Sequence, residues 1–170
     1  MFHVKKYLLA ACIGCLASGA WAQDTATGAK IREANRIADA FVAYVDSLHA
    51  ELFAAAGGPT PGRPDTPKDI RNKEITTRLF VEEGKGEELK TRIEQTRAAL
   101  IGLAPRSKRK ALSKKMPLLI EPLPRHSSAR NWVEYKFKQM PVAAVFPILG
   151  KLRADARTSA ELVIQSLRNN

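Results

Sequence analysis

Four glutamates on either side of a glycine pair are the first side chains in this sequence that could do chemistry. Glu82 and Glu83 end one segment, and Glu87 and Glu88 begin the next. A hard cation needs oxygen ligands that converge from a turn at set spacing, and the alternation of an EF-hand loop is missing here. Acidic side chains in a first helical turn instead complement the helix dipole. We therefore interpret the cluster as the solvated start of a helix and predict no metal site.

The remaining candidates for catalysis are few and scattered. His49 and His126 share neither the His-x₃-His nor the His-Glu-x-x-His spacing of metal sites. Residues 84–86, Gly-Lys-Gly, lack the spacing of a phosphate-binding loop. Both cysteines, Cys12 and Cys15, lie near the N-terminus, in a segment that we expect to be removed. The sequence therefore predicts no catalytic residue and no cofactor site, and we do not expect an enzyme.

A basic run at residues 106–115 is the most prominent electrostatic feature. Such a run can form an anion-binding loop that faces lipid headgroups or an acidic protein partner, although a solvated loop is the more common role of a basic run. No aromatic residue interleaves it, so base stacking is unsupported and we expect no nucleic acid partner. The candidate anion-binding residues are Arg106, Lys108, Arg109, Lys110, Lys114 and Lys115.

The N-terminus has the three parts of a secretory signal peptide. Lys5 and Lys6 precede an apolar core at residues 7–20, and Ala20-Trp21-Ala22 forms a cleavage site. We predict a signal peptide at residues 1–22 and a periplasmic location. Two alternatives stay open, which are lipidation at Cys12 and an uncleaved helix that anchors the chain in the inner membrane.

Residues 23–170 have the size of one domain. They carry 26 basic and 17 acidic side chains, a net charge of +9. Export makes nucleic acid a poor partner for this charge, whereas an anionic membrane surface or an acidic protein could attract it. Without cysteine, this domain must be stabilised by its core or by a partner.

Two long helical patterns frame the domain. After a small, polar leader at residues 23–28, apolar residues alternate at spacings of three and four from Ile31 to Leu52, and Gly57-Gly58 should end that helix. A similar stripe runs from Val145 to Leu167. A stripe of this kind must be buried against other helices or a partner. The candidate bundle and interaction face comprises Phe41, Val45, Leu48, Leu52, Trp132, Leu149, Leu152, Val163 and Leu167.

The segments between these helices complete an all-α prediction. Residues 59–67 hold four prolines and predict a stiff surface connection, and shorter helices are expected at 69–82 and 87–104. Residues 116–124 are too rich in proline for a helix or a central strand, so we expect an extended arm that packs through its leucines and isoleucine. The predicted fold is a helical bundle of about four helices, with long first and last helices and an extended Pro-rich arm.

Three segments give the chain a family resemblance. Residues 39–48 (DAFVAYVDSL) resemble the first periplasmic helix of the gliding motility and type IX secretion protein M family, GldM/PorM. Residues 79–90 (LFVEEGKGEELK) are similar to its second and third helices. Residues 132–145 (WVEYKFKQMPVAAV), with the segment to residue 167, resemble the end of its N-terminal domain. The matches occur in the family's order.

The resemblance implies a helical, non-catalytic domain that pairs with other proteins. In that family a dimer is anchored in the inner membrane by one N-terminal helix, which joins a small membrane protein in a proton-driven motor, and three further periplasmic domains follow. This chain differs in its signal-like N-terminus and in ending after the helical domain.

The hypothesis is a periplasmic accessory module of a type IX secretion or gliding apparatus in a Bacteroidetes-type bacterium. Its expected partners are components of that apparatus or a second copy of the chain. The alternative is a periplasmic protein that binds anionic lipid or an acidic partner through residues 106–115.

Overall fold

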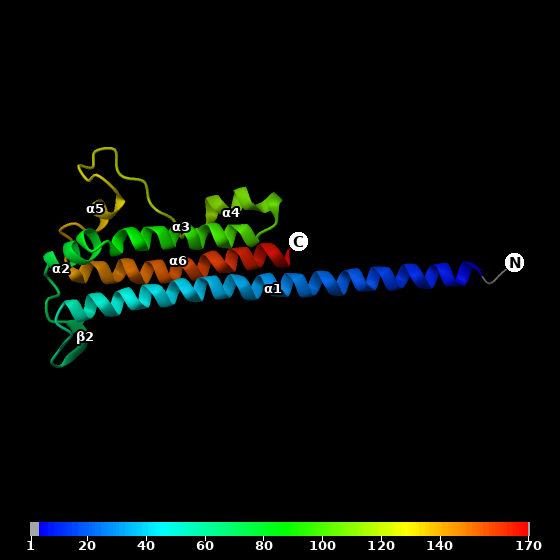
Figure 1. Cartoon of the computed structure of the whole chain (residues 1–170), viewed down its shortest axis with the longest axis horizontal. Coiled ribbons are helices and arrows are strands. Elements are labelled where there is room, and N and C mark those ends of the chain that lie inside the picture. The colour runs from blue at the N-terminus through cyan, green and yellow to red at the C-terminus, as the bar shows by residue number, and fades with distance from the viewer. Residues whose placement is uncertain (1–3, 170) are drawn as a thin grey trace.

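Three long helices lie side by side and form the body of the molecule (Figure 1). The computed structural model describes residues 4–169, with side chains from Thr25 onward. The long helices are α1 (Val4–Ala55), α3 (Lys85–Leu103) and α6 (Val142–Arg168). Helix α1 continues beyond the bundle toward the N-terminus (Figure 1). The all-α prediction is confirmed, with long first and last helices.

Helix α1 is longer at its N-terminus than the sequence predicts. Residues 23–28, predicted as a loose leader, belong to the helix. Each residue added to an existing helix gains one backbone hydrogen bond, so a helix propagates readily through small polar residues. The predicted C-terminal stop is confirmed, since Gly57 has a φ of 84° and the Gly58 N–H donates to the Phe53 carbonyl at 3.1 Å. This is the Schellman arrangement that closes a helix with a left-handed residue.

The proline-rich connection after α1 forms a small antiparallel hairpin. Strand β1 (Pro59–Thr60) pairs with β2 (Arg63–Pro67). The sequence predicted no β-structure here, because proline cannot donate to a strand ladder. A short, isolated pair tolerates the prolines, since their missing N–H groups can face outward. This hairpin is small and local, so the fold class remains all-α.

The predicted helix at 69–82 begins later than expected and changes its winding. Helix α2 (Glu74–Thr76) leads into the π-helical turn η1 (Thr77–Glu82). Turns precede it, and the Asn72 side-chain oxygen accepts from the Glu74 N–H at 2.8 Å, which satisfies a free donor at the helix start.

The remaining segments are short. A 3₁₀ turn, η2 (Arg106–Lys108), leads into α4 (Arg109–Lys115), and α5 (Trp132–Phe137) precedes α6. The basic run was predicted as a loop and is helical instead, because Leu112 packs into the core and fixes that turn. Residues 116–131 connect α4 to α5 without a helix or strand, and we call them the arm. The extended arm was predicted at residues 116–124, so the observed segment is longer than the prediction.

Two separate regions of core fill the bundle. The larger surrounds Phe41, Phe80, Phe137 and Leu149, and the aromatic rings of Phe80 and Phe137 stack with centroids 4.4 Å apart. The smaller lies toward α4 and the C-terminal end of α6, and it contains small residues such as Ala34, Ala38 and Ala160. Both predicted stripes therefore face inward.

Candidate functional site

The nine residues nominated as a bundle and interaction face all lie in the core. Phe41, Val45, Leu48, Leu52, Trp132, Leu149 and Leu152 belong to the larger region, and Val163 and Leu167 to the smaller one. Each is buried by the chain's own helices. Two of the nine, Trp132 and Leu152, also line the open groove that is described next.

This open groove lies between the arm, α5 and α6. Its cavity has a volume of about 260 Å³. Leu119, one of the few large apolar side chains exposed among the described residues, forms one wall and is 40% exposed. We call this site the arm groove. Its lining residues are Pro117, Leu119, Glu121, Trp132, Lys136, Ile148, Lys151, Leu152 and Asp155.

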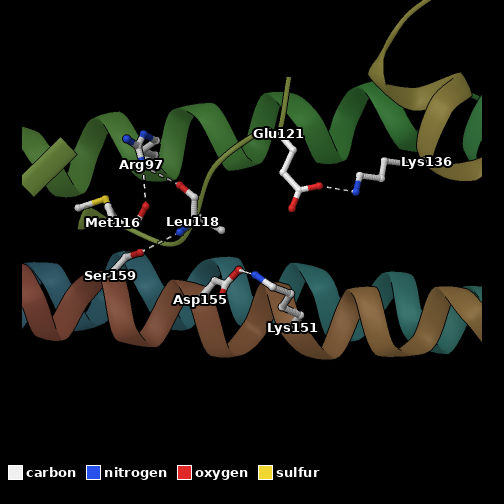
Figure 2. Close-up of polar contacts among 8 residues, drawn as sticks. All are labelled: Arg97, Met116, Leu118, Glu121, Lys136, Lys151, Asp155 and Ser159. Carbon is white, nitrogen blue, oxygen red and sulfur yellow. Dashed lines mark hydrogen bonds and ion pairs between the residues drawn. The ribbon is translucent and has the colours of Figure 1, made fainter. Parts of the chain in front are cut away.

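Two ion pairs mark the edges of the arm groove (Figure 2). The Lys136 Nζ lies 2.6 Å from Glu121 Oε2, which joins α5 to the arm. The Lys151 Nζ lies 2.5 Å from Asp155 Oδ2, one turn apart on α6. The hydrogen bond from Lys136 lowers the pKa of Glu121 below its usual value. The rim is therefore charged but balanced, over an apolar floor.

Arg97 holds the arm in place from α3 (Figure 2). Its guanidinium donates to the carbonyl oxygens of Met116 at 3.2 Å and Leu118 at 2.9 Å, and also to the Ser113 carbonyl. From α6, the Ser159 hydroxyl accepts the Leu118 N–H at 3.3 Å. An extended segment without strand partners needs such acceptors and donors, because buried backbone groups must be paired.

The arm packs less uniformly than predicted. Leu118 is fully buried, and Ile120 and Leu123 are half-buried, as the expected inward contacts require. The prediction that Leu119 also faces inward is wrong, because an extended backbone directs successive side chains to opposite sides. Arg97 was missed entirely. No motif or spacing distinguishes it from the other polar residues of α3.

Helix α5 supplies the inner wall of the arm groove. The Asn131 side chain caps it by accepting the Glu134 N–H at 2.9 Å. Trp132 is 7% exposed, and its ring meets Phe137 edge-on with centroids 5.7 Å apart. The indole N–H of Trp132 finds no acceptor among the described residues. Trp132 and Phe137 are therefore buried against the core, whereas Tyr135 of the same helix is 42% exposed.

The six candidate anion-binding residues divide into two groups. Lys108 donates to the carbonyl oxygens of Ser166 and Asn169 at the end of α6, at 3.1 and 2.9 Å. Arg109 donates to Ala104 and Gly102 at the end of α3, at 3.0 and 2.6 Å. These cations satisfy free carbonyls and the negative end of each helix dipole. The other four, Arg106, Lys110, Lys114 and Lys115, are exposed.

The acidic cluster and the histidines form no convergent site. Glu83, Glu87 and Glu88 pair with nearby basic residues at the surface. His49 packs against Phe146 with ring centroids 4.6 Å apart, and His126 is exposed in the arm. Within the described residues, no group of three His, Cys, Asp or Glu side chains could hold a metal ion.

The described side chains begin after the predicted signal peptide. The predicted signal peptide, residues 1–22, lies outside the residues with described side chains. Among the helices whose side chains are described, none is long and apolar enough to cross a membrane.

Together, the bundle and the arm groove define a class of protein, a helical domain with an open apolar surface beside a clamped arm. Residues 17–170 match the family described as the GldM N-terminal domain. The chain belongs to this family, as the resemblance indicated. Membership relates it to the machinery of gliding motility and type IX secretion. No curated protein matches the chain.

Proposed function

We propose that this chain is a non-enzymatic interaction module of a type IX secretion or gliding apparatus, and that it binds an apolar segment of another component of that apparatus in the arm groove. The observation that carries the proposal is the arm groove itself. It leaves apolar surface open on a molecule whose predicted apolar stripes are buried. Family membership supports the choice of apparatus.

The arm groove has features that suit a protein segment. Its lining offers the apolar side chains of Leu119, Ile148 and Leu152, and burial of apolar surface drives most protein association. The balanced ion pairs at its rim resemble the polar edge that surrounds an apolar interface core. Arg97 and Ser159 fix the arm, so the groove is preformed and little ordering accompanies binding.

A site-specific crosslinker tests this proposal in cells that carry the apparatus. A photoreactive side chain replaces Leu119 in one strain and exposed Asp65, in strand β2, in a matched control strain. We expect position 119, and not position 65, to crosslink to one defined component of the apparatus. The Leu119→Glu variant should lose that component from a purified complex by at least tenfold while keeping its helical content.

Two results would overturn the proposal. Equal crosslinking from positions 119 and 65 would mean that the arm groove is not a binding site. A crosslinked species of twice the chain's mass would assign the groove to a second copy of this chain instead.

The proposal also includes the cellular location of the module. We place the module in the periplasm, exported by the signal peptide at residues 1–22, and the alternative is an inner-membrane anchor. Helix α1 runs without a break across Ala22 and Gln23, a continuity that the anchor alternative requires. The mass of the chain isolated from cells separates the two. A chain that starts at Gln23 supports export and cleavage, whereas a membrane-bound chain that retains Met1 supports the anchor.

A further inference from the structure

The charge of this molecule is concentrated at one end of the bundle. Residues 25–40, 94–115 and 157–169 surround the smaller core region, and we call them the basic end. They contain 12 basic and 4 acidic residues, a net charge of +8. Residues 41–93 and 116–156 contain 14 basic and 12 acidic residues, a net charge of +2. Nearly all of the excess positive charge therefore lies at the basic end.

Part of this charge is free to act on a partner. Lys108 and Arg109 are occupied at helix ends, but Arg106, Lys110, Lys114 and Lys115 are exposed along η2 and α4. Among the ion pairs of the described residues, none neutralises these four side chains. Lys30 and Arg32 on α1 are also exposed and lack such an ion pair. The basic end thus presents uncompensated positive charge from three elements, η2, α4 and α1.

The surface around these charges suits contact with the surface of a membrane and not insertion into it. Leu112, the apolar residue of α4 that could enter a membrane, is buried against the core instead. The arm groove lies elsewhere, beside α5 and α6. The cavity that Arg36, Ile37 and Gln95 help to line does not include the exposed cations of η2 and α4, and the basic end contains no aromatic side chain. Exposed cations of this kind suit an extended anionic surface more than a single folded ligand.

We infer that the basic end docks on the anionic headgroups of a phospholipid bilayer. Helix α1 leaves the bundle at this same end and continues toward the N-terminus (Figure 1). The sequence carries no charged residue from Tyr7 to Ala20. Lys30 follows Ala20 by ten residues, or about 15 Å along a helix. In the anchored alternative, the headgroup region takes up about 5–7 Å of that separation, so the first cations of the basic end lie about 8–10 Å from its outer surface, roughly one Debye length at physiological salt. In the cleaved form, the contact rests on the exposed charge alone.

This contact is purely electrostatic. It strengthens with the fraction of anionic lipid and weakens when salt is added, because salt shortens the range of exposed charges from about 10 Å at 0.1 M to about 3 Å at 1 M. It is independent of the arm groove, so a variant that loses one interaction keeps the other.

A vesicle-binding assay with charge-matched variants tests the inference. The chain as isolated from cells is mixed with vesicles of phosphatidylcholine, with and without phosphatidylglycerol, and the bound fraction is measured by flotation. The test variant changes Arg106, Lys110, Lys114 and Lys115 to Gln. The control variant changes Arg63, Arg71, Lys73 and Arg125 to Gln, which removes the same charge from exposed positions at the other segments.

We expect the gain in binding that phosphatidylglycerol produces to fall more than tenfold in the test variant. The control variant should stay within about twofold of the unchanged chain, because only cations near the bilayer contribute. Circular dichroism and thermal unfolding confirm that both variants are folded. Binding to phosphatidylcholine alone reports any contribution of the N-terminal apolar segment and is subtracted.

Three outcomes would overturn the inference. Equal losses in the two variants would mean that net charge alone matters. A lipid-dependent gain that survives 1 M salt would mean that insertion, and not headgroup contact, holds the chain. Binding to polyglutamate without binding to phosphatidylglycerol vesicles would assign the basic end to an acidic protein.

Discussion

Gly86 is a point of close approach between α3 and its neighbours. A Cβ atom there would lie 2.3 Å from Val133 Cγ1 and 2.6 Å from the Phe80 carbonyl oxygen. The first neighbour is a side chain on α5, and the second is backbone that cannot move cheaply. Only glycine therefore allows α3, α5 and η1 to meet at this point.

Replacement of Gly86 by Ala should destabilise the fold by about 1–3 kcal/mol, because the added methyl overpacks a buried contact. Gly150→Ala is the matched control in α6, where nothing lies within 4 Å of an added Cβ. The control should instead gain about 0.5–1 kcal/mol from helix propensity. Urea unfolding of both variants measures the difference. Similar effects of the two substitutions would contradict the close approach at Gly86.

His49 gives the molecule a weak dependence on pH. Burial lowers its pKa, the positive charge of Arg153 acts in the same direction, and Asp46 opposes them. The folded chain therefore binds a proton at His49 less readily than the unfolded chain. Its contribution to stability is present above the ordinary histidine pKa of about 6.5 and is lost as pH falls below it.

We expect the urea midpoint to decrease between pH 7 and pH 5, and the His49→Gln variant to show a smaller decrease. His126→Gln, in the exposed arm, serves as the control and should keep the slope of the unchanged chain. If both variants retain the same pH dependence, other groups are responsible for it.

At the scale of elements, side chains from two helices hold the arm, and Arg97 of α3 makes more of these bonds than Ser159 of α6. Arg97 donates to three carbonyl groups at residues 113–118, a set of bonds that no other described residue supplies. Arg97→Met keeps most of the side-chain volume and removes those donors. The loss should be about 2–3 kcal/mol, since hydrogen bonds from a charged donor are stronger than neutral ones.

Hydrogen exchange locates that effect. Amides of residues 117–131 should exchange faster in Arg97→Met, while those of α1 keep their protection. Arg157→Met, at an exposed position on α6, is the control and should leave the arm unchanged. Unaltered exchange in the arm of Arg97→Met would show that apolar contacts, rather than this clamp, hold the segment.

The elements that the sequence predicted are those with periodic apolar residues. The stripes of α1 and α6 are visible because each helix is long and buries one face, and Gly57 marks a stop with a direct backbone cause. Helix α4 has Leu112 as its main apolar anchor, so no period could reveal it. The hairpin at 59–67 escaped because proline content argues against strands in general but not against a short isolated pair.

The arm groove shows a further limit of sequence analysis. The arm itself was predicted from its prolines, but Leu119 differs from Leu118 only by one position. The side that each faces depends on how Arg97 and Ser159 hold the backbone, which is a tertiary property. Likewise, Lys108 and Arg109 are indistinguishable from their basic neighbours until the ends of α3 and α6 are placed beside them.

At the scale of the whole molecule, the two core regions differ in what they bury. The larger region contains Phe41, Phe80, Trp132 and Phe137, whereas the smaller region contains no aromatic side chain and is rich in alanine. Less apolar surface is removed from water at the basic end, and less stabilisation follows. The excess positive charge there adds repulsion between like charges. The two ends of a single bundle should therefore differ in local stability.

Native-state hydrogen exchange tests this difference along α6, which spans both regions. Amides near Leu149 and Leu152 should open only with the whole fold, whereas amides near Val163 and Leu167 should open at a lower free energy. Added salt should narrow the difference, because it screens the repulsion but leaves the buried area unchanged. Equal opening free energies along α6 would mean that the helix transmits the stability of the larger region to its far end. In that case the excess positive charge at the basic end does not lower the stability of the fold.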